Sequence, residues 1–442
     1  MNALLDKVRA DLAALQDRRR LIASGRVTRF DGQFLECDGF PVIVGTVCQI
    51  ETPSNEIALA EVIGLREGRN LLFLYDLDAR IQIGARVTAV EGDDRIKVGA
   101  NLLGRVIDAQ GQPLDNLGPL DLQELWSLRG RPVNPLARKP VTQPLDVGVR
   151  VVNALLSVGR GQRLGIVAGS GVGKSVLLSM MTRFSEADVI VMALIGERGR
   201  EVGAMVEQVM QGDAQNKVVV VAVPADRSAL LRIRGAHRAT AIAEYFRAQG
   251  KEVLLIMDSL TRVAHARREV GLALGEQPTV KGYPPSVVSL IPALVERSGT
   301  GTEGQGAITA FYPVLADSDD TANDPVVDTA RAILDGHIVL SRSQTQLGIY
   351  PAVDITASVS RVMLDITPAR QQAAAIRFRR LVSLYLENRD LMLMGGYQVG
   401  QDPELDFAVS MWSKLTGFIK QAPNEPASFA ESQKGLIAMM GE

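Results

Sequence analysis

The eight residues 168–175, which read AGSGVGKS, constrain the fold of this chain more than any other segment. They follow a short apolar run, 163–167, and precede an apolar, helix-compatible run, 176–181. A strand, a glycine-rich turn and a helix in this order form a phosphate-binding loop. The glycines let backbone N–H groups point at an anion, and the amino terminus of the helix adds partial positive charge. The segment therefore predicts a parallel α/β sheet with a nucleotide site at its edge.

The side chains of this loop have expected roles of their own. Lys174 is expected to reach the β- and γ-phosphates, and the Ser175 hydroxyl is expected to bind Mg²⁺. Ala168 stands where the pattern has its first glycine, but this residue only starts the turn. The predicted nucleotide-binding residues of the loop are Gly169, Ser170, Gly171, Val172, Gly173, Lys174 and Ser175.

The composition is that of a globular protein and excludes some classes of function. Its 442 residues suggest about three domains at ~150 residues each. Lys and Arg total 48 against 50 for Asp and Glu, so the net charge of −2 gives no general attraction to nucleic acid or an anionic membrane. The two cysteines, Cys37 and Cys48, fit a reducing compartment as small buried residues, with a disulfide between them as the alternative. No apolar run approaches ~18 residues and no signal-peptide pattern follows Met1, so we expect a cytoplasmic protein whose membrane contact is peripheral.

The amino-terminal part of the chain predicts a helix followed by a small barrel. Residues 1–21 carry apolar residues at helical spacing and are expected to form a helix, packed on its own domain or docked on a partner. Its terminal position favours docking. Residues 22–98 hold short β-rich runs between glycines, such as 41–47 and 57–63, which is typical of a small β-barrel.

The remainder of the chain predicts an α/β domain and then helices. Residues 99–150 form a Gly/Pro-rich connector that leads into an α/β domain over 99–367. Near-continuous apolar runs in this domain indicate a parallel sheet covered by helices on both faces. Residues 368–442 are expected to be helical. The predicted buried strands are 164–167, 189–195, 217–223, 253–257, 307–311 and 337–340.

Charged residues that follow the buried strands are the other candidates for chemistry. Asp258 comes at the end of a predicted strand, where a carboxylate can hold Mg²⁺. Glu197 and Arg198 follow another strand, so Glu197 can activate a water molecule and Arg198 can stabilise charge on the γ-phosphate, unless this segment is only a charged surface turn. Nothing in the sequence around Arg361 indicates a role for this arginine. It is either an ordinary surface arginine or one that a neighbouring subunit uses.

The whole chain resembles the catalytic subunits of rotary ATPases and their secretion relatives. Within that group it looks most like the flagellar type III export ATPases, and three segments, 131–150, 158–165 and 168–175, favour the flagellar branch over the virulence injectisome. The segments that carry the resemblance are AGSGVGKS (168–175), IGERGREV (195–202), LLIMDSLTR (254–262), GYPPSV (282–287), DGHIVLSR (335–342), GIYPAVD (348–354) and SVSRV (358–362).

The resemblance implies a RecA-like ATPase domain and a role for each matching residue. Glu197 matches the catalytic carboxylate, and Arg361 matches the arginine finger that reaches the site of the next subunit. Tyr350 matches the tyrosine that stacks on adenine, an interaction that suits a flat aromatic ring. Lys174, Ser175 and Asp258 hold phosphate and Mg²⁺ in the family, and Arg198 and Arg262 lie on the phosphate side.

The resemblance also implies partners and a cellular setting. The family forms homohexameric rings with the active sites between subunits. The amino-terminal helix binds a stator-like regulatory protein, and a coiled-coil stalk protein inserts in the pore. The ring docks under the export gate at the inner face of the cytoplasmic membrane, where export substrates and their chaperones arrive.

Alternative functions remain open from the residues alone. A ring motor of the transcription-terminator type shares the same domain order, but residues 22–98 have few aromatic residues and no basic stripe between them. A non-catalytic ring subunit would lack the catalytic carboxylate or the lysine, and this chain has both Glu197 and Lys174. A proton-translocating synthase subunit is the nearest relative outside secretion. We therefore expect Mg²⁺-dependent ATP hydrolysis that powers or primes protein export.

Overall fold

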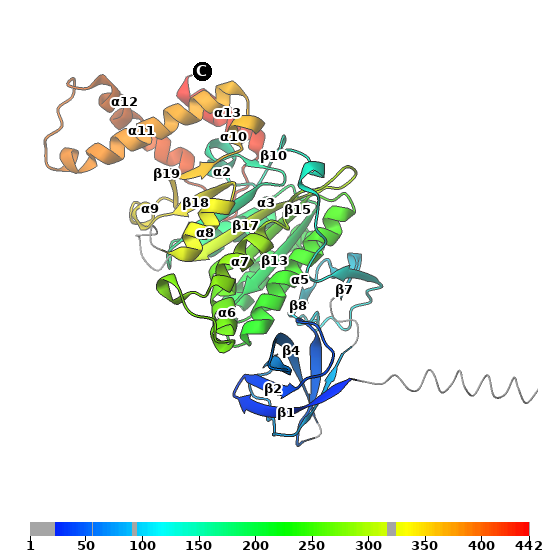
Figure 1. Cartoon of the computed structure of the whole chain (residues 1–442). Helices are drawn as coiled ribbons and strands as arrows, with labels where there is room; N and C mark the ends of the chain where they lie inside the picture. Colours follow the sequence, from blue (N-terminus) through cyan, green and yellow to red (C-terminus); the bar gives the residue numbers. More distant parts are fainter. Residues whose placement is uncertain (1–22, 55, 91–94, 316–323, 442) are drawn as a thin grey trace, which may run out of the picture. The chain divides into compact units, whose positions relative to one another are not determined.

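The computed structural model describes residues 23–54, 56–90, 95–315 and 324–441 (Figure 1). These residues form two compact units, and the second unit begins at Arg95. The helix expected over residues 1–21 lies outside the described residues. The fold class expected from the sequence is confirmed, because a small β-barrel precedes a parallel-sheet core that is followed by helices.

The first unit is a closed six-stranded barrel with its own hydrophobic core. Its strands follow one another around the barrel in the order β1-β2-β5-β4-β3-β6. Alternate residues of β1 and β2 are buried, as expected for strands with one face toward a core. The barrel strands are β1 (Ser24–Asp31), β2 (Phe34–Asp38), β3 (Val47–Glu51), β4 (Ile57–Arg66), β5 (Arg69–Leu74) and β6 (Arg86–Ala89).

Two expectations about the barrel have different outcomes. The strand expected over 41–47 is wrong, because this segment is irregular up to β3, and Gly45 adopts a φ of 97° within a turn. A residue in that conformation cannot continue a strand. Cys37 and Cys48 are free and buried, and burial raises the pKa of the Cys37 thiol to about 12, so it packs as an apolar side chain.

The segment after the barrel belongs to the second unit. Strand β7 (Arg95–Val98) pairs with β9 (Glu124–Ser127), although the sequence placed residues 95–98 in the barrel domain. The connector expected over 99–150 also contributes β8 (Val106–Ile107), which pairs in parallel with β14 at the edge of the main sheet.

The second unit is built on a nine-stranded sheet whose order is β19-β18-β12-β17-β15-β13-β14-β8, with β16 paired to β17. All pairings along the path are parallel except that between β18 and β19. Every residue of β13 is buried, which fits a strand covered on both faces. The remaining strands of this unit are β10 (Pro144–Leu145), β11 (Val158–Gly159), β12 (Arg163–Ala168), β13 (Val189–Ile195), β14 (Val218–Val223), β15 (Val253–Asp258), β16 (Gly299–Thr300), β17 (Ala307–Leu315), β18 (Gly336–Leu340) and β19 (Val353–Ser360).

Helices cover both faces of this sheet. Figure 1 shows α5 (Ala229–Ala248), α6 (Leu260–Ala273) and α7 (Pro285–Val295) in front of the strands. The opposite side chains of the strands join a hydrophobic core that includes α2 and α3 and continues into the carboxyl-terminal helices. The remaining helices of the core are α2 (Arg150–Leu155), α3 (Lys174–Phe184), α4 (Gly199–Val209), α8 (Pro325–Ile333), α9 (Arg342–Gln346) and α10 (Met363–Ile366).

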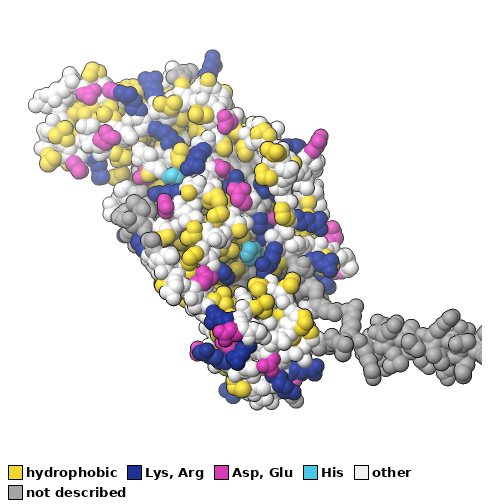
Figure 2. Space-filling model, in the orientation of Figure 1, with side chains coloured by type: hydrophobic (Ala, Val, Ile, Leu, Met, Phe, Trp, Pro, Cys, Tyr) yellow, Lys and Arg dark blue, Asp and Glu magenta, His cyan; other side chains and the backbone are white. Residues whose placement is uncertain are grey.

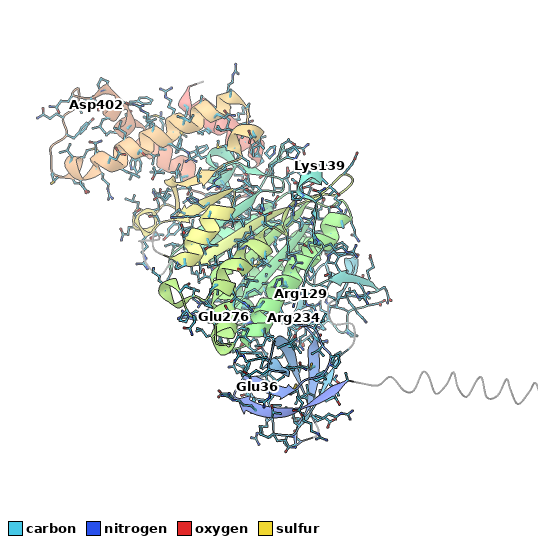
Figure 3. The ribbon with its side chains drawn as sticks, viewed as in Figure 1. Glu36, Arg129, Lys139, Arg234, Glu276 and Asp402 are labelled. Atoms are coloured by element: carbon cyan, nitrogen blue, oxygen red, sulfur yellow. The ribbon has the colours of Figure 1, made fainter. Side chains whose placement is uncertain are left out.

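The carboxyl-terminal region is helical, as expected. It consists of α11 (Ala369–Leu393), α12 (Pro403–Ile419) and α13 (Phe429–Met440). Asp402, labelled in Figure 3, caps α12 by accepting hydrogen bonds from the N–H groups of Glu404 and Leu405. Side chains from all three helices belong to the same core as α2 and α3, so this region is packed onto the sheet domain.

A buried polar cluster lies where α5 meets the segment after α7. The guanidinium of Arg297 donates two hydrogen bonds of 2.9 Å to the buried carboxylate of Glu244. Burial and the nearby charges of Arg297, Arg129 and Arg234 lower the pKa of His237 to about 3, so His237 is neutral at pH 7 (Figure 3 labels Arg129 and Arg234). Loss of Arg297 would leave the Glu244 carboxylate buried without its ion-pair partner.

Candidate active site

The predicted site residues converge at the carboxyl edge of the main sheet. Strands β12, β13, β15 and β18 run in parallel, so the residues that follow them meet at one edge. A cavity of 510 Å³ opens there. It is lined by Ala168, Gly169, Ser170, Gly171, Gly173, Lys174, Ser175, Val176, Leu194, Glu197, Arg198, Glu201, Val202, Met205, Asp258, Arg262, Leu315 and Arg342.

The glycine loop forms the floor of this cavity between β12 and α3. Gly173 has a φ of 91° and stands just before α3, so the helix begins at Lys174 with its free N–H groups at the cavity. A Cβ added at Gly169 or Gly171 would meet no atom within 4 Å, so the backbone there borders open space. The buried Val172 side chain joins the core instead and anchors the loop from below.

Lys174 lies between two carboxylates in the lining of the cavity. Its ammonium hydrogen-bonds Oδ1 of Asp258 and lies 3.6 Å from Oε1 of Glu197. All three side chains are largely buried, with Asp258 only 4% exposed. Charges in such a place interact more strongly than at the surface. The lysine and both acids therefore form one electrostatic unit, although up to 84 residues separate them in the sequence.

The backbone around Glu197 is fixed by the neighbouring strand. The Gly196 N–H donates to Val223 O at 2.7 Å, and Glu197 O accepts from the Ala225 N–H at 3.0 Å. Burial, with the charges of Asp258 and Glu201, raises the pKa of Glu197, while Lys174 and Arg262 act in the opposite direction. The buried Oε1 atom of Glu197 has no hydrogen-bond donor among the described residues. An oxygen of this kind, directed at a cavity, is suited to accept a hydrogen bond from water.

Arg262 crosses directly over Gly196. A Cβ at Gly196 would lie 2.7 Å from Cβ of Arg262 and 3.0 Å from its Cγ, and Gly196 has a φ of 72°. Only glycine fits both the close approach and this backbone conformation. The arginine from α6 is thereby brought to the same side of the cavity as Glu197.

Two further arginines supply positive charge at the rim. Arg198 is 78% exposed and lies 3.8 Å from Glu201 in a weak ion pair. Arg342, which sequence reasoning did not assign to the site, begins α9 directly after β18 and also lines the cavity. Its signal was available in principle, because β18 is the sheet neighbour of β12 and residues after parallel strands share one edge.

Tyr350 lies beside the glycine loop but outside the lining of the cavity. The Cδ1 atom of its ring is 3.9 Å from the position that a Cβ would take at Gly173, and half of the residue is exposed. An aromatic ring next to the phosphate loop can stack on a nucleotide base.

Arg361 is placed at the opposite edge of the sheet. Its N–H donates to Asp335 O, and the Asp335 N–H donates to Arg163 O at the start of β12. The glycine loop follows the other end of β12, and six residues at ~3.3 Å each separate the edges by about 20 Å. The side chain is exposed and donates to Arg331 O at 3.3 Å. Arg361 therefore cannot reach the cavity of its own chain.

The residues expected to hold Mg²⁺ fit that ion by their chemistry. The Ser175 hydroxyl and the Asp258 carboxylate both line the cavity, and Mg²⁺ prefers oxygen ligands of these kinds. Taken together, the cavity has backbone N–H groups and cations for a polyphosphate and an acid that can accept a proton. Such an arrangement can transfer a phosphoryl group to water.

Two family models match the second unit of the chain. Residues 148–360 match the nucleotide-binding domain of the ATP synthase alpha/beta family, and residues 367–438 match the T3SS EscN ATPase C-terminal domain. The first of these covers the glycine loop, Glu197, Asp258 and Tyr350.

Known proteins resemble the chain over nearly its full length. It is 49% identical to the flagellum-specific ATP synthase of Salmonella typhimurium, covering 98% of this chain and 96% of that protein. It is 46% identical to the flagellum-specific ATP synthase of Bacillus subtilis, covering 94% and 95%. The structure of the assembled ATPase EscN from the enteropathogenic E. coli type III secretion system matches with a TM-score of 0.89 at 41% identity, covering 94% of this chain and all of that one. The structure of EscN in complex with its central stalk EscO matches with a TM-score of 0.86 at 40% identity over the same shares.

Proposed function

The chain belongs to the family of flagellum-specific ATP synthases, and we propose that it hydrolyses Mg²⁺-bound ATP to energise or prime protein export through the flagellar type III secretion apparatus. The observation that carries this proposal is the convergence of Lys174, Glu197 and Asp258 behind a glycine loop. A virulence injectisome is the second candidate for the export system, because the matching solved structures come from one.

Each group of residues in the cavity has its own proposed role in hydrolysis. The N–H groups of the loop and Lys174 hold the phosphates, while Glu197 orients a water molecule in line with the γ-phosphate and accepts its proton. Arg198 and Arg262 stabilise the charge that develops on the phosphate oxygens. Ser175 and Asp258 would hold Mg²⁺, which would supply positive charge to offset that of the phosphates.

Tyr350 completes the site on the side of the nucleotide base. Its ring is half exposed next to Gly173, so it can stack on adenine without first leaving a packed core. In this assignment Arg342 is the fourth cation in the lining of the phosphate cavity, after Lys174, Arg198 and Arg262.

We further propose a homohexameric ring in which Arg361 acts as the arginine finger of the neighbouring site. The distance between Arg361 and the glycine loop supports this role, since the arginine has no use in its own site. Solved relatives include an assembled ATPase and a complex with a central stalk. By analogy with that complex, we propose that a coiled-coil stalk protein occupies the pore, and that a stator-like regulatory protein binds residues 1–21.

The export gate, export substrates and chaperones are the remaining proposed partners, at the inner face of the cytoplasmic membrane. No helix within the described part of the chain has the length and apolar character needed to cross a bilayer. Nucleic acid is not a proposed partner. Figure 2 shows positive and negative side chains interspersed on the visible face, whereas nucleic-acid binding favours a continuous basic surface.

The test combines enzymology with genetic complementation. Purified wild-type protein is expected to release phosphate from ATP when Mg²⁺ is present, and Lys174→Ala is expected to abolish release while keeping the thermal unfolding profile. The wild-type gene should restore motility to a Salmonella typhimurium strain that lacks its flagellum-specific ATP synthase. Restoration of injectisome secretion alone would support the second candidate, and ATP hydrolysis that requires RNA would reject both.

A further inference from the structure

The loop between α12 and α13 is fastened to the backbone of Tyr350. The N–H of Gln421 in this loop donates to Tyr350 O at 2.9 Å. Gln421 is only 5% exposed, so its side chain is held inside the protein. The loop therefore links the carboxyl-terminal helices directly to the residue that we assign to the nucleotide base.

The Gln421 side chain fixes the position of this loop on the sheet domain. Its Nε2 group donates to Gly148 O at 2.9 Å and to Glu425 O at 2.6 Å. Its Oε1 atom accepts from the N–H of Arg150, the first residue of α2, at 2.7 Å. A single side chain thus joins the loop, the segment before α2 and the start of α2.

A second side chain braces the same loop from outside. The Arg150 guanidinium donates to Lys420 O at 3.0 Å and to Glu425 Oε1 at 2.6 Å. Arg150 is about one quarter exposed and Glu425 about one half, so this ion pair contributes less than the buried bonds of Gln421. Gln421 is therefore the main side-chain anchor at the end of the loop next to Tyr350, while the far end is held by Ala427, whose N–H donates to Gly148 O at 3.1 Å.

We infer that Gln421 is a positioning residue for ATP, which sets the placement of Tyr350 and so couples the carboxyl-terminal helices to nucleotide affinity. This inference rests on the proposed function, since it assumes that Tyr350 stacks on the base. Removal of the Gln421 side chain takes one hydrogen-bond partner from each of the backbone groups of Gly148, Arg150 and Glu425, although Gly148 O keeps its bond from the Ala427 N–H. The loop then shifts to satisfy them, and Tyr350 follows.

The chemical step should be spared by such a shift. Lys174, Glu197 and Asp258 are fixed by β12, β13 and β15, and none of the hydrogen bonds of Gln421 reaches those strands. A loss of base stacking weakens binding of the substrate and of the transition state alike, so it raises KM and leaves kcat near its wild-type value.

Gln371 provides a matched control in the same interface. It is fully buried on α11, and its Nε2 group donates to Ala154 O at 3.0 Å and to Ser157 Oγ at 2.9 Å, at the other end of α2. It therefore also joins a carboxyl-terminal helix to α2 but makes no contact with Tyr350 that the structure records. Gln371→Ala is expected to lower stability without raising KM.

The experiment measures kcat and KM for ATP in the full-length wild type, Gln421→Ala, Tyr350→Ala, the double variant and Gln371→Ala, with thermal unfolding of each. Gln421→Ala is expected to raise KM about fivefold, which corresponds to one hydrogen bond of about 1 kcal/mol, with kcat within about twofold. The double variant is expected to have the KM of Tyr350→Ala alone, because the two residues act through one contact. If Gln421→Ala does not fold, Gln421→Glu keeps the volume and the acceptor for Arg150 but loses both N–H donations.

The outcomes separate this inference from the proposed function. The positioning role is overturned if KM changes equally in Gln421→Ala and Gln371→Ala. It is also overturned if the increase in KM of the double variant is the product of the two single increases. An unchanged KM in Tyr350→Ala overturns the base assignment and the inference with it, while hydrolysis stands. Hydrolysis that survives Lys174→Ala would instead reject the proposed function itself.

Discussion

The ammonium of Lys174 lies 3.6 Å from Oε1 of Glu197 and at the same time hydrogen-bonds Asp258. This places the expected phosphate-binding cation against the expected base. Two carboxylates in one buried site repel each other, and the lysine between them offsets that repulsion. A nucleotide that enters the site offers phosphate oxygens to the same lysine. Phosphate binding therefore also changes the electrostatic environment of Glu197.

Glu197→Gln is expected to abolish hydrolysis while ATP still binds. The amide keeps the size of the side chain but cannot accept the proton of the attacking water, so kcat should fall about 10²–10⁴-fold. Phosphate release measures the loss, and titration with a fluorescent ATP analogue measures binding. Turnover close to that of the wild type would remove Glu197 from the role of base.

The same substitution is not expected to destabilise the protein at pH 7. A glutamate whose pKa is raised by folding stabilises the folded state when protonated, and that contribution is lost as the pH rises through the raised value. At neutral pH, above the ordinary pKa of a glutamate, the raised pKa of Glu197 therefore lowers the free energy of unfolding, and glutamine lacks this penalty. Thermal unfolding should give a Tm for Glu197→Gln at or above that of the wild type.

The pH dependence of hydrolysis should show an acid limb. Because burial raises the pKa of Glu197 above its ordinary value of 4.5, its proton-accepting form is lost at a higher pH than for an exposed glutamate. kcat/KM should therefore fall as the pH decreases through the raised value. Measured profiles of kcat/KM against pH, with unfolding followed at each pH, check this expectation. A rate that stays constant down to pH 4.5 contradicts it.

Gly196→Ala is expected to reduce kcat about 10–100-fold, because a methyl group would push Arg262 out of place. Gly203→Ala is the matched control. Gly203 lies within α4, and a Cβ there meets no atom within 4 Å, so alanine should leave kcat unchanged and favour the helix slightly. Steady-state kinetics of both variants test the contact. Equal kinetics in the two variants would show that Arg262 is not displaced.

Arg361→Ala is expected to lower hydrolysis about 10³–10⁵-fold, as for other arginine fingers. Mixing it with Glu197→Gln chains should restore activity, because a Glu197→Gln chain can lend Arg361 to a neighbour that has an intact Glu197. Phosphate release against the mixing ratio measures this rescue, and light scattering reports the size of the assemblies. No rescue in mixed assemblies of wild-type size would place the arginine outside the active site.

Arg297→Ala is expected to cost about 3–5 kcal/mol of unfolding free energy, because it leaves the buried Glu244 carboxylate without its ion-pair partner and with only the Trp126 indole N–H among its side-chain donors. Urea unfolding in the absence of nucleotide provides the measurement. The exposed pair of Arg380 and Glu404 is the control, and Arg380→Ala should leave stability near that of the wild type. A small effect at Arg297 would mean that water reaches Glu244.

The sequence was sufficient to predict the sheet and the acidic residues at its edge, because both predictions depend only on short apolar runs and the residues directly after them. Apolar runs mark buried strands, and parallel strands present the residues that follow them at one edge, which is how Glu197 and Asp258 could be found. Arg342 obeys the same rule but was missed, since no distinct motif chemistry accompanies it. The strand expected over 41–47 is wrong because the chain makes a turn at Gly45 before β3, and local strand propensity does not predict that turn.

Contacts between distant segments could not be predicted in this way. Gln421 bonds to Arg150 across 271 residues, and no periodicity or motif signals that pair. Likewise, the sequence alone did not decide whether Arg361 is an ordinary surface residue or a residue that acts in the active site of a neighbouring subunit. Only the sheet topology shows that Arg361 lies near the amino end of β12, whereas the glycine loop follows its carboxyl end.

Because Arg361 is far from the glycine loop of its own chain, the number of complete active sites depends on how many subunits have assembled. If every site needs an arginine from the next chain, an open string of subunits has one complete site fewer than it has members, whereas a closed circle has as many sites as chains. Separate monomers would then hydrolyse almost no ATP, and closure of the ring would complete the final active site. The cell could thus limit ATP expenditure through local accumulation of the protein, with no separate inhibitor.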